Sequence, residues 1–68
     1  MATGTVKWFN ATKGFGFIVP DEGGKDVFVH ITAVQAAGMT TLTEGQRLSY
    51  EVEDDRKGQK AADLTPLD

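Results

Sequence analysis

Short stretches of alternating apolar and polar residues run along most of the chain, separated by segments rich in glycine, proline, asparagine or aspartate. A period of two places successive side chains on opposite faces of a strand. Five such stretches predict strands at 4–10, 15–19, 26–30, 46–53 and 59–65. No stretch has the period of a long amphipathic helix, so the pattern predicts an all-β fold.

The connection between the third and fourth predicted strands is longer than the others. Thr32-Ala33-Val34-Gln35 has the spacing of a capping box with Thr32 as the cap, and Gly38 is a stop signal, so one short helical turn is expected there. Five short strands with a long third connection fit a five-stranded antiparallel Greek-key barrel of the OB-fold type, which leaves no sheet edge exposed.

The second and third predicted strands are apolar on both faces. Phe15 and Phe17 share one face of their strand, as Phe28 and His30 do of theirs, while valines and isoleucines occupy the opposite faces. A small protein rarely exposes a large apolar patch without a use for it, so one face should be core and the other a binding site. Flat rings next to cations suit unpaired bases, because every base has a π-face and every nucleotide carries a phosphate.

Trp8 does not follow from this alternation. In a regular strand it shares a face with Val6, a predicted core residue, so only a bulge or strong curvature would bring Trp8 to the face that carries the phenylalanines.

The last two predicted strands should contribute one face each to the core. Alternation predicts that their inward side chains are Leu48, Tyr50, Val52, Ala62 and Leu64.

Length and composition limit the other possibilities. The 68 residues fit one small domain, 1–68, and the absence of cysteine excludes disulfides and thiolate metal sites. No stretch resembles a signal peptide or a membrane span, so we expect a soluble, cytoplasmic protein, with monomer as the default state. The net charge of −3 is unusual for a nucleic-acid binder. The acidic excess falls after residue 31, which predicts binding by stacking with a shallow salt dependence.

An enzyme is the least supported class. A catalytic site needs a nucleophile with a nearby base, or paired carboxylates in a cleft, and the chain has one histidine and no cysteine. No metal, cofactor or small-molecule substrate is indicated. A protein-interaction module that uses the same aromatic patch is the alternative, although lysines next to the patch favour nucleic acid.

Three segments carry a family resemblance, namely Gly4-Thr5-Val6-Lys7-Trp8-Phe9-Asn10, Lys13-Gly14-Phe15-Gly16-Phe17-Ile18 and Asp26-Val27-Phe28-Val29-His30-Ile31. Together they resemble the bacterial cold-shock proteins, and the similarity extends over nearly the whole chain. The resemblance implies a barrel that binds single-stranded RNA and DNA with low sequence specificity. It also implies a passive RNA chaperone with a role in the cold-shock response and in the regulation of transcription or translation.

The family's binding roles transfer to this chain by position. They give an aromatic platform of Trp8, Phe15, Phe17, Phe28 and His30, flanking cations Lys7 and Lys13, edge residues Phe9 and Asn10, and the hairpin cation Lys57. Ile31 and Met39 stand where the best-studied members carry a phenylalanine and an aromatic residue, which predicts a platform that is shorter at one end. The resemblance also makes Asp21 a candidate base contact.

Overall fold

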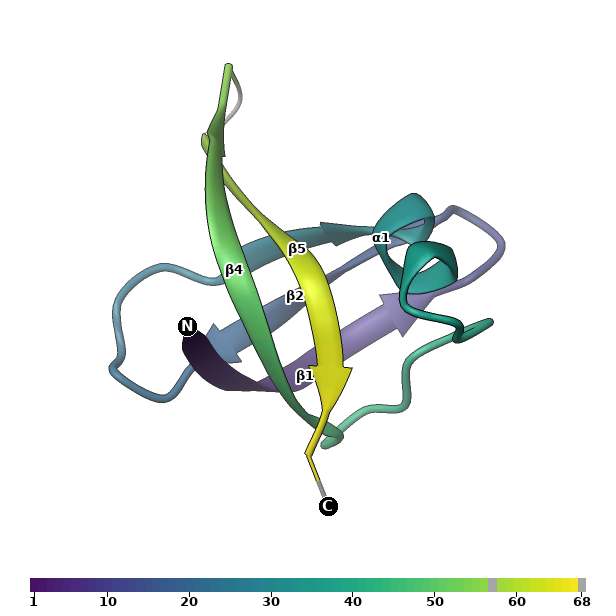
Figure 1. Ribbon diagram of the computed structural model, residues 1–68, viewed down its shortest axis with the longest axis horizontal. Helices are drawn as coiled ribbons and strands as arrows, with labels where there is room; N and C mark the ends of the chain where they lie inside the picture. The colour runs from purple at the N-terminus through teal and green to yellow at the C-terminus, as the bar shows by residue number, and fades with distance from the viewer. Residues whose placement is uncertain (57, 68) are drawn as a thin grey trace.

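The computed structural model describes residues 1–56 and 58–67 and arranges them as a β-barrel with one short helix (Figure 1). The elements are β1 (Ala2–Asn10), β2 (Phe15–Pro20), β3 (Val27–His30), α1 (Ile31–Ala36), β4 (Arg47–Asp55) and β5 (Gly58–Pro66). Each predicted strand is present, and its ends lie within two residues of the predicted ones. The turns fall at the glycine-containing segments, where Gly14, Gly23 and Gly24 adopt positive φ.

The strands close into a barrel in the order β1-β2-β3-β5-β4. β4 pairs with β1, so the first four strands have the Greek-key arrangement 4-1-2-3. The predicted OB-type barrel is confirmed, with one refinement of its strand directions. β3 and β5 run parallel and meet at Phe28 and Lys60. An odd number of strands cannot alternate in direction all the way round a closed ring, so one parallel seam is unavoidable.

The core fills the inside of this barrel. Ile18, Val27 and Val29 are buried, as alternation in β2 and β3 predicts, and they pack with Leu48 and Tyr50 of β4. Val6, Val34, Leu42, Ala61 and Leu64 complete the buried cluster. Because the inward faces of β2 and β3 are fully used by the core, their aromatic faces point outward.

Alternation fails in β4 and β5. Val52 is 41% exposed, and the β4–β5 register shifts between Ser49 and Glu51, just before it. The far ends of β4 and β5 extend beyond the rest of the barrel (Figure 1). In β5, Ala61 is buried and Ala62 is only half-buried, contrary to prediction. Asp63 adopts a φ of 50°, which interrupts the alternation and lets Ala61 and Leu64 both face inward.

The helical turn begins two residues earlier than the capping-box spacing predicts. His30 is the N-cap of α1, and its Nδ1 accepts a hydrogen bond from the Thr32 backbone N–H at 3.2 Å. The predicted stop is present, since Gly38 has a φ of 82°. Its N–H donates to the Gln35 carbonyl, and the Met39 N–H donates to the Val34 carbonyl, which is the bonding pattern of a Schellman motif.

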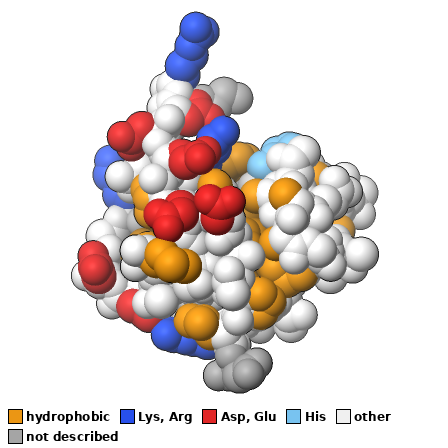
Figure 2. Space-filling view, viewed as in Figure 1, with side chains coloured by type: hydrophobic (Ala, Val, Ile, Leu, Met, Phe, Trp, Pro, Cys, Tyr) orange, Lys and Arg blue, Asp and Glu red, His pale blue; other side chains and the backbone are white. Residues whose placement is uncertain are grey.

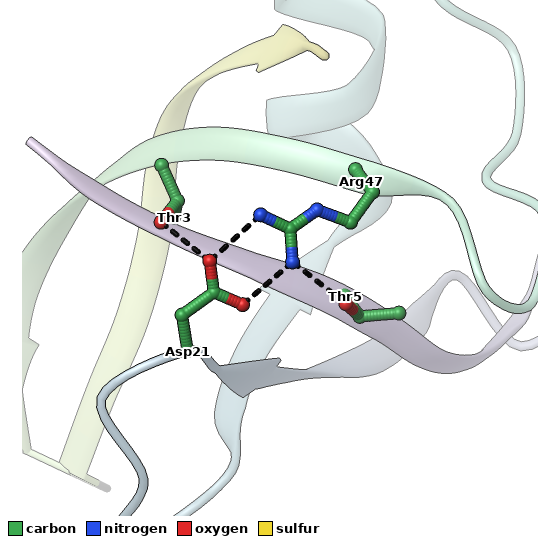
Figure 3. Close-up of polar contacts among 4 residues, drawn as sticks. All are labelled: Thr3, Thr5, Asp21 and Arg47. Carbon is green, nitrogen blue, oxygen red and sulfur yellow. Dashed lines mark hydrogen bonds and ion pairs between the residues drawn. The ribbon is translucent and has the colours of Figure 1, made fainter. Parts of the chain in front are cut away.

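A polar cluster ties the β2–β3 connection to β1 and β4 (Figure 3). Both carboxylate oxygens of Asp21 accept hydrogen bonds from the Arg47 guanidinium, at 2.7 and 2.8 Å. The Thr3 hydroxyl also donates to Asp21, at 2.7 Å, and Arg47 reaches Thr5 at 3.4 Å. Asp21 is therefore held by structural contacts in this cluster, which argues against the base contact that the resemblance suggested for it.

The Asp21 cluster predicts a pH dependence of stability. The hydrogen bonds from Arg47 and then from Thr3 lower the pKa of Asp21 below its ordinary value. A carboxyl group with a lowered pKa in the folded state stabilises the protein above its unfolded pKa, and this contribution is lost as the pH falls through the folded pKa. Urea midpoints of the wild type and Asp21→Asn should therefore differ at neutral pH and converge in acid. The difference should be small, because the pair is exposed. A pH-independent difference would contradict this assignment.

Candidate nucleic-acid interface

The pairing register sets the aromatic side chains in two rows on the outer face of β1, β2 and β3. One row runs from Trp8 through Phe17 and Phe28 to Lys60, which are paired in sequence across four strands. The second row contains Asn10, Phe15 and His30. All five predicted members of the aromatic platform therefore lie together.

A β-bulge brings Trp8 onto this face. The β1–β2 register shifts between Val6 and Trp8, so that Val6 is buried in the core while Trp8 is half-buried on the outer side. The Trp8 ring centroid lies 5.5 Å from those of Phe15 and Phe17. Of the two possibilities that the sequence left open for Trp8, a bulge or strong curvature, the structure has the bulge.

The rings of the aromatic platform contact one another mainly in edge-to-face arrangements. Trp8 meets Phe15 and Phe17 at interplanar angles of 67° and 61°, and Phe17 meets Phe28 at 70° with a centroid distance of 5.9 Å. Phe28 and His30 are tilted by 42° at 6.3 Å. The four larger rings are half-buried and His30 is exposed. Rings that touch by their edges keep part of their faces free for stacking.

Phe9 lies on the opposite side of β1 from the aromatic platform. It pairs with Gly16 and packs partly buried against the core. A side chain on Gly16 would lie 2.8 Å from the Phe9 ring and 2.3 Å from the Trp8 carbonyl oxygen, so glycine is what allows β1 and β2 to approach here. This placement favours a supporting role for Phe9 rather than a contact with bases.

Three other predicted contacts have local structural partners. The Asn10 carboxamide oxygen accepts from the Lys13 backbone N–H at 3.0 Å and so organises the β1–β2 turn. Ile31 is half-buried, and its N–H donates to the Gly14 carbonyl. Met39 packs partly buried against the core in the Schellman motif.

The cations near the aromatic platform differ in their surroundings. The Lys7 ammonium pairs with Asp26 at 3.0 Å, whereas Lys13 is exposed and has no ion pair with any described carboxylate. Lys57 lies outside the described residues.

Sequence reasoning missed a groove next to the aromatic platform. The groove has a volume of about 480 Å³, and Phe17, Phe28 and His30 line it on one side. The charged residues Asp55, Arg56 and Lys60 line it from the β4–β5 hairpin. No motif in the sequence marks Arg56 or Lys60 as binding residues. Their approach depends on the parallel β3–β5 seam, which brings together residues distant in the sequence, and no local pattern reveals that seam.

The comparison with known families agrees with this geometry. The model of the "Cold-shock" DNA-binding domain matches residues 2–67. The chain belongs to the cold-shock domain family. It is 67% identical over 64 residues to a probable cold shock protein, y4cH, from Sinorhizobium fredii, and the alignment covers 93% of each chain.

Other cold-shock relatives are similar over nearly their whole length. The identity is 58% over 65 residues to the cold shock-like protein CspA of Vibrio cholerae, which covers 96% of this chain and 93% of that protein. It is 55% over 64 residues to the cold shock-like protein CspE of Escherichia coli, with coverages of 94% and 93%. The cold-shock family is a nucleic-acid-binding, non-enzymatic family, which agrees with an interface built from stacking rings.

Charge is distributed unevenly over this cold-shock domain. Acidic side chains gather over the β4–β5 hairpin (Figure 2), where Glu51, Glu53 and Asp54 are exposed. The aromatic platform lies on other strands, but Glu53 lines a small cavity together with His30, so this carboxylate reaches the edge of the platform. Among the described residues, no group of three potential ligands could hold a metal ion, and no helix is long and apolar enough to cross a membrane.

Proposed function

We propose that this cold-shock domain binds single-stranded RNA and DNA with low sequence specificity by stacking unpaired bases on the aromatic platform. The observation that carries the proposal is the convergence of five rings from three strands on one outer face, made possible by the bulge at Trp8. Rings recognise the π-face that all bases share, so stacking tolerates many sequences.

Such binding would make the protein a passive RNA chaperone. Stacking is worth about 1–3 kcal/mol per base, and a base-pair step of a duplex is worth about 1.4 kcal/mol. Three or four occupied rings would therefore offset a few weak base-pair steps without nucleotide hydrolysis. In the cell we place this activity in the cytoplasm, in the cold-shock response and in the regulation of transcription or translation, performed by a monomer of one domain without a cofactor.

Fluorescence of Trp8, the only tryptophan, tests this function directly. Titration with a short oligothymidine should quench the fluorescence strongly, whereas a duplex of equal length should have little effect. A label-free binding assay run in parallel guards against a silent complex. Absence of binding in both assays would contradict the proposal and favour a protein partner for the same rings.

Lys13 should contribute most of its binding energy through phosphate contacts. Because its ammonium has no described ion pair to break, Lys13→Gln should reduce the slope of log affinity against log salt by about 0.7, the value for one phosphate of a single strand. The turn should survive, since the backbone of residue 13 makes the bond to Asn10. Binding isotherms at several salt concentrations measure the slope. An unchanged slope would mean that Lys13 does not meet a phosphate.

A further inference from the structure

Lys60 continues one row of the aromatic platform onto β5. It pairs with Phe28 across the parallel seam, so the row that begins with Trp8 and Phe17 ends at a cation. Neighbouring strands lie about 4.8 Å apart, and paired residues point their side chains to the same face of a sheet. The next residue, Ala61, is buried in the core, as expected if Lys60 points outward. The Lys60 side chain therefore starts beside the Phe28 ring.

The Lys60 side chain is held at the level of the rings. It is half-buried, whereas Lys13 is exposed. Lys60 lines the groove together with Phe28 and His30. It also lines the smaller cavity of about 220 Å³ that contains Glu53. A cation between two cavities beside the rings is placed to meet the edge of a base that stacks on them. The phosphates of such a strand lie beyond the sugars, farther from the rings.

The Lys60 ammonium is available to a ligand. Glu53 is its partner in the β4–β5 register, but the two side chains form no ion pair, and no other described carboxylate pairs with Lys60. Asp55 and Glu53 balance the charges of Arg56 and Lys60 around the two cavities, so the site has no net charge to attract a phosphate. A neutral acceptor suits this site, because a lysine side chain has three N–H donors and no acceptor.

We propose that Lys60 selects the base that stacks on Phe28, by donating a hydrogen bond to a carbonyl oxygen on the edge of that base. Thymine, uracil and guanine have a carbonyl oxygen at the position where cytosine and adenine have an amino group. The site should therefore prefer the first three bases. The inference rests on the proposed function and adds selectivity at one position to binding that tolerates many sequences elsewhere.

A thymine isostere without carbonyl oxygens tests the contact. Difluorotoluene has the shape of thymine but carries fluorine in place of both oxygens. Oligothymidines with one difluorotoluene nucleotide at each position in turn are titrated against the wild type and Lys60→Met, which keeps the apolar stem and removes the ammonium. The strand is the shortest that saturates the platform, so that it binds in one register. At one position the wild type should lose about three- to tenfold in affinity, the effect of one hydrogen bond, and the variant should lose nothing.

Base composition and salt separate a base contact from a phosphate contact. Lys60→Met should bind oligothymidine about three- to tenfold more weakly than the wild type, with nearly unchanged affinity for oligodeoxyadenosine and an unchanged salt slope. Lys13→Gln is the matched comparison, because loss of a phosphate contact should weaken both strands by the same factor and reduce the slope. Each variant is compared with the wild type on the same strand, so the stacking of the free strand cancels.

The outcomes distinguish the two proposals. Equal weakening of both strands by Lys60→Met with a reduced salt slope would mean that Lys60 meets a phosphate, which overturns the base selectivity. A difluorotoluene position that is equally sensitive in the wild type and in Lys60→Met would assign the carbonyl contact to another residue and also overturn it. If no position weakens the wild type, no carbonyl oxygen is bound, and the inference fails whether or not the variant folds. Failure of the wild type to bind either single strand overturns the proposed function itself.

Discussion

Phe17→Ala and Phe28→Ala should each weaken the binding of single-stranded oligothymidine by about 1–3 kcal/mol, or roughly 5- to 150-fold. Phe17 and Phe28 occupy adjacent positions of the same row of rings, and both line the groove beside the hairpin. Each substitution therefore removes one stacking surface. Because both rings are half-buried on the outer face, the loss of folding free energy should be smaller than the loss of binding free energy.

Val29→Ala is the matched control for these two variants. Val29 lies between Phe28 and His30 on β3, but its side chain is fully buried in the core. Its truncation should cost about 1–3 kcal/mol of folding free energy and leave the affinity of the folded protein nearly unchanged. Urea unfolding and oligothymidine titration of all three variants give the comparison. Equal unfolding losses in the two groups would place the phenylalanines in the core and remove the basis of the site.

The double variant Phe17→Ala/Phe28→Ala tests whether the rings act separately. The centroids of the Phe17 and Phe28 rings are 5.9 Å apart, so each ring supports the position of the other. Residues in contact show non-additive effects. If one base stacks on each ring, the binding free energy lost by the double variant should be slightly less than the sum of the two single losses. The difference arises because each single substitution also removes support from the remaining ring. A double variant no weaker than either single variant would mean that the two rings hold one base together.

The sequence predicted the structure best in segments whose conformation depends on residues that are adjacent in the sequence. In β2 and β3 a strict period of two separates Phe15 and Phe17 from Ile18, and Phe28 from Val29, so the two faces could be assigned without knowledge of the fold. The barrel followed from the number of strands and the long third connection. The family resemblance added what the period could not, above all the place of Trp8.

The errors occurred where a single backbone conformation or a distant contact decides the outcome. Asp63 in a positive-φ conformation shifts the inward face of β5 from Ala62 to Ala61, and aspartate is only one of several residues that tolerate this conformation. The cap of α1 is His30, because its ring accepts a hydrogen bond from the Thr32 N–H. Thr32 therefore lies inside the helix and is not its cap. Lys60 reaches Phe28 through the parallel seam, 32 residues along the chain, which no local pattern encodes.

Gly16→Ala should cause the largest loss of stability among the variants considered, at least about 3 kcal/mol, the upper end of the usual cost of overpacking. The added methyl group would lie 2.3 Å from the Trp8 carbonyl oxygen and 2.7 Å from the Phe9 Cα. Both are backbone atoms, so relief requires β1 to move away from β2. For a small domain with a stability of about 5 kcal/mol, such a loss leaves about 2 kcal/mol, or roughly one unfolded molecule in thirty.

Gly24→Ala supplies the control for the added methyl group. Gly24 has open space around it, and its φ of 92° makes any side chain unfavourable by about 1–2 kcal/mol, without a clash. Gly16→Ala should therefore be clearly less stable than Gly24→Ala in urea. It should also bind oligothymidine more weakly even at temperatures where it is folded, because separation of β1 from β2 moves Trp8 away from Phe17. Full affinity in folded Gly16→Ala would show that bases do not need Trp8 and Phe17 in contact. The close approach of two backbones at Gly16 would then serve the barrel alone.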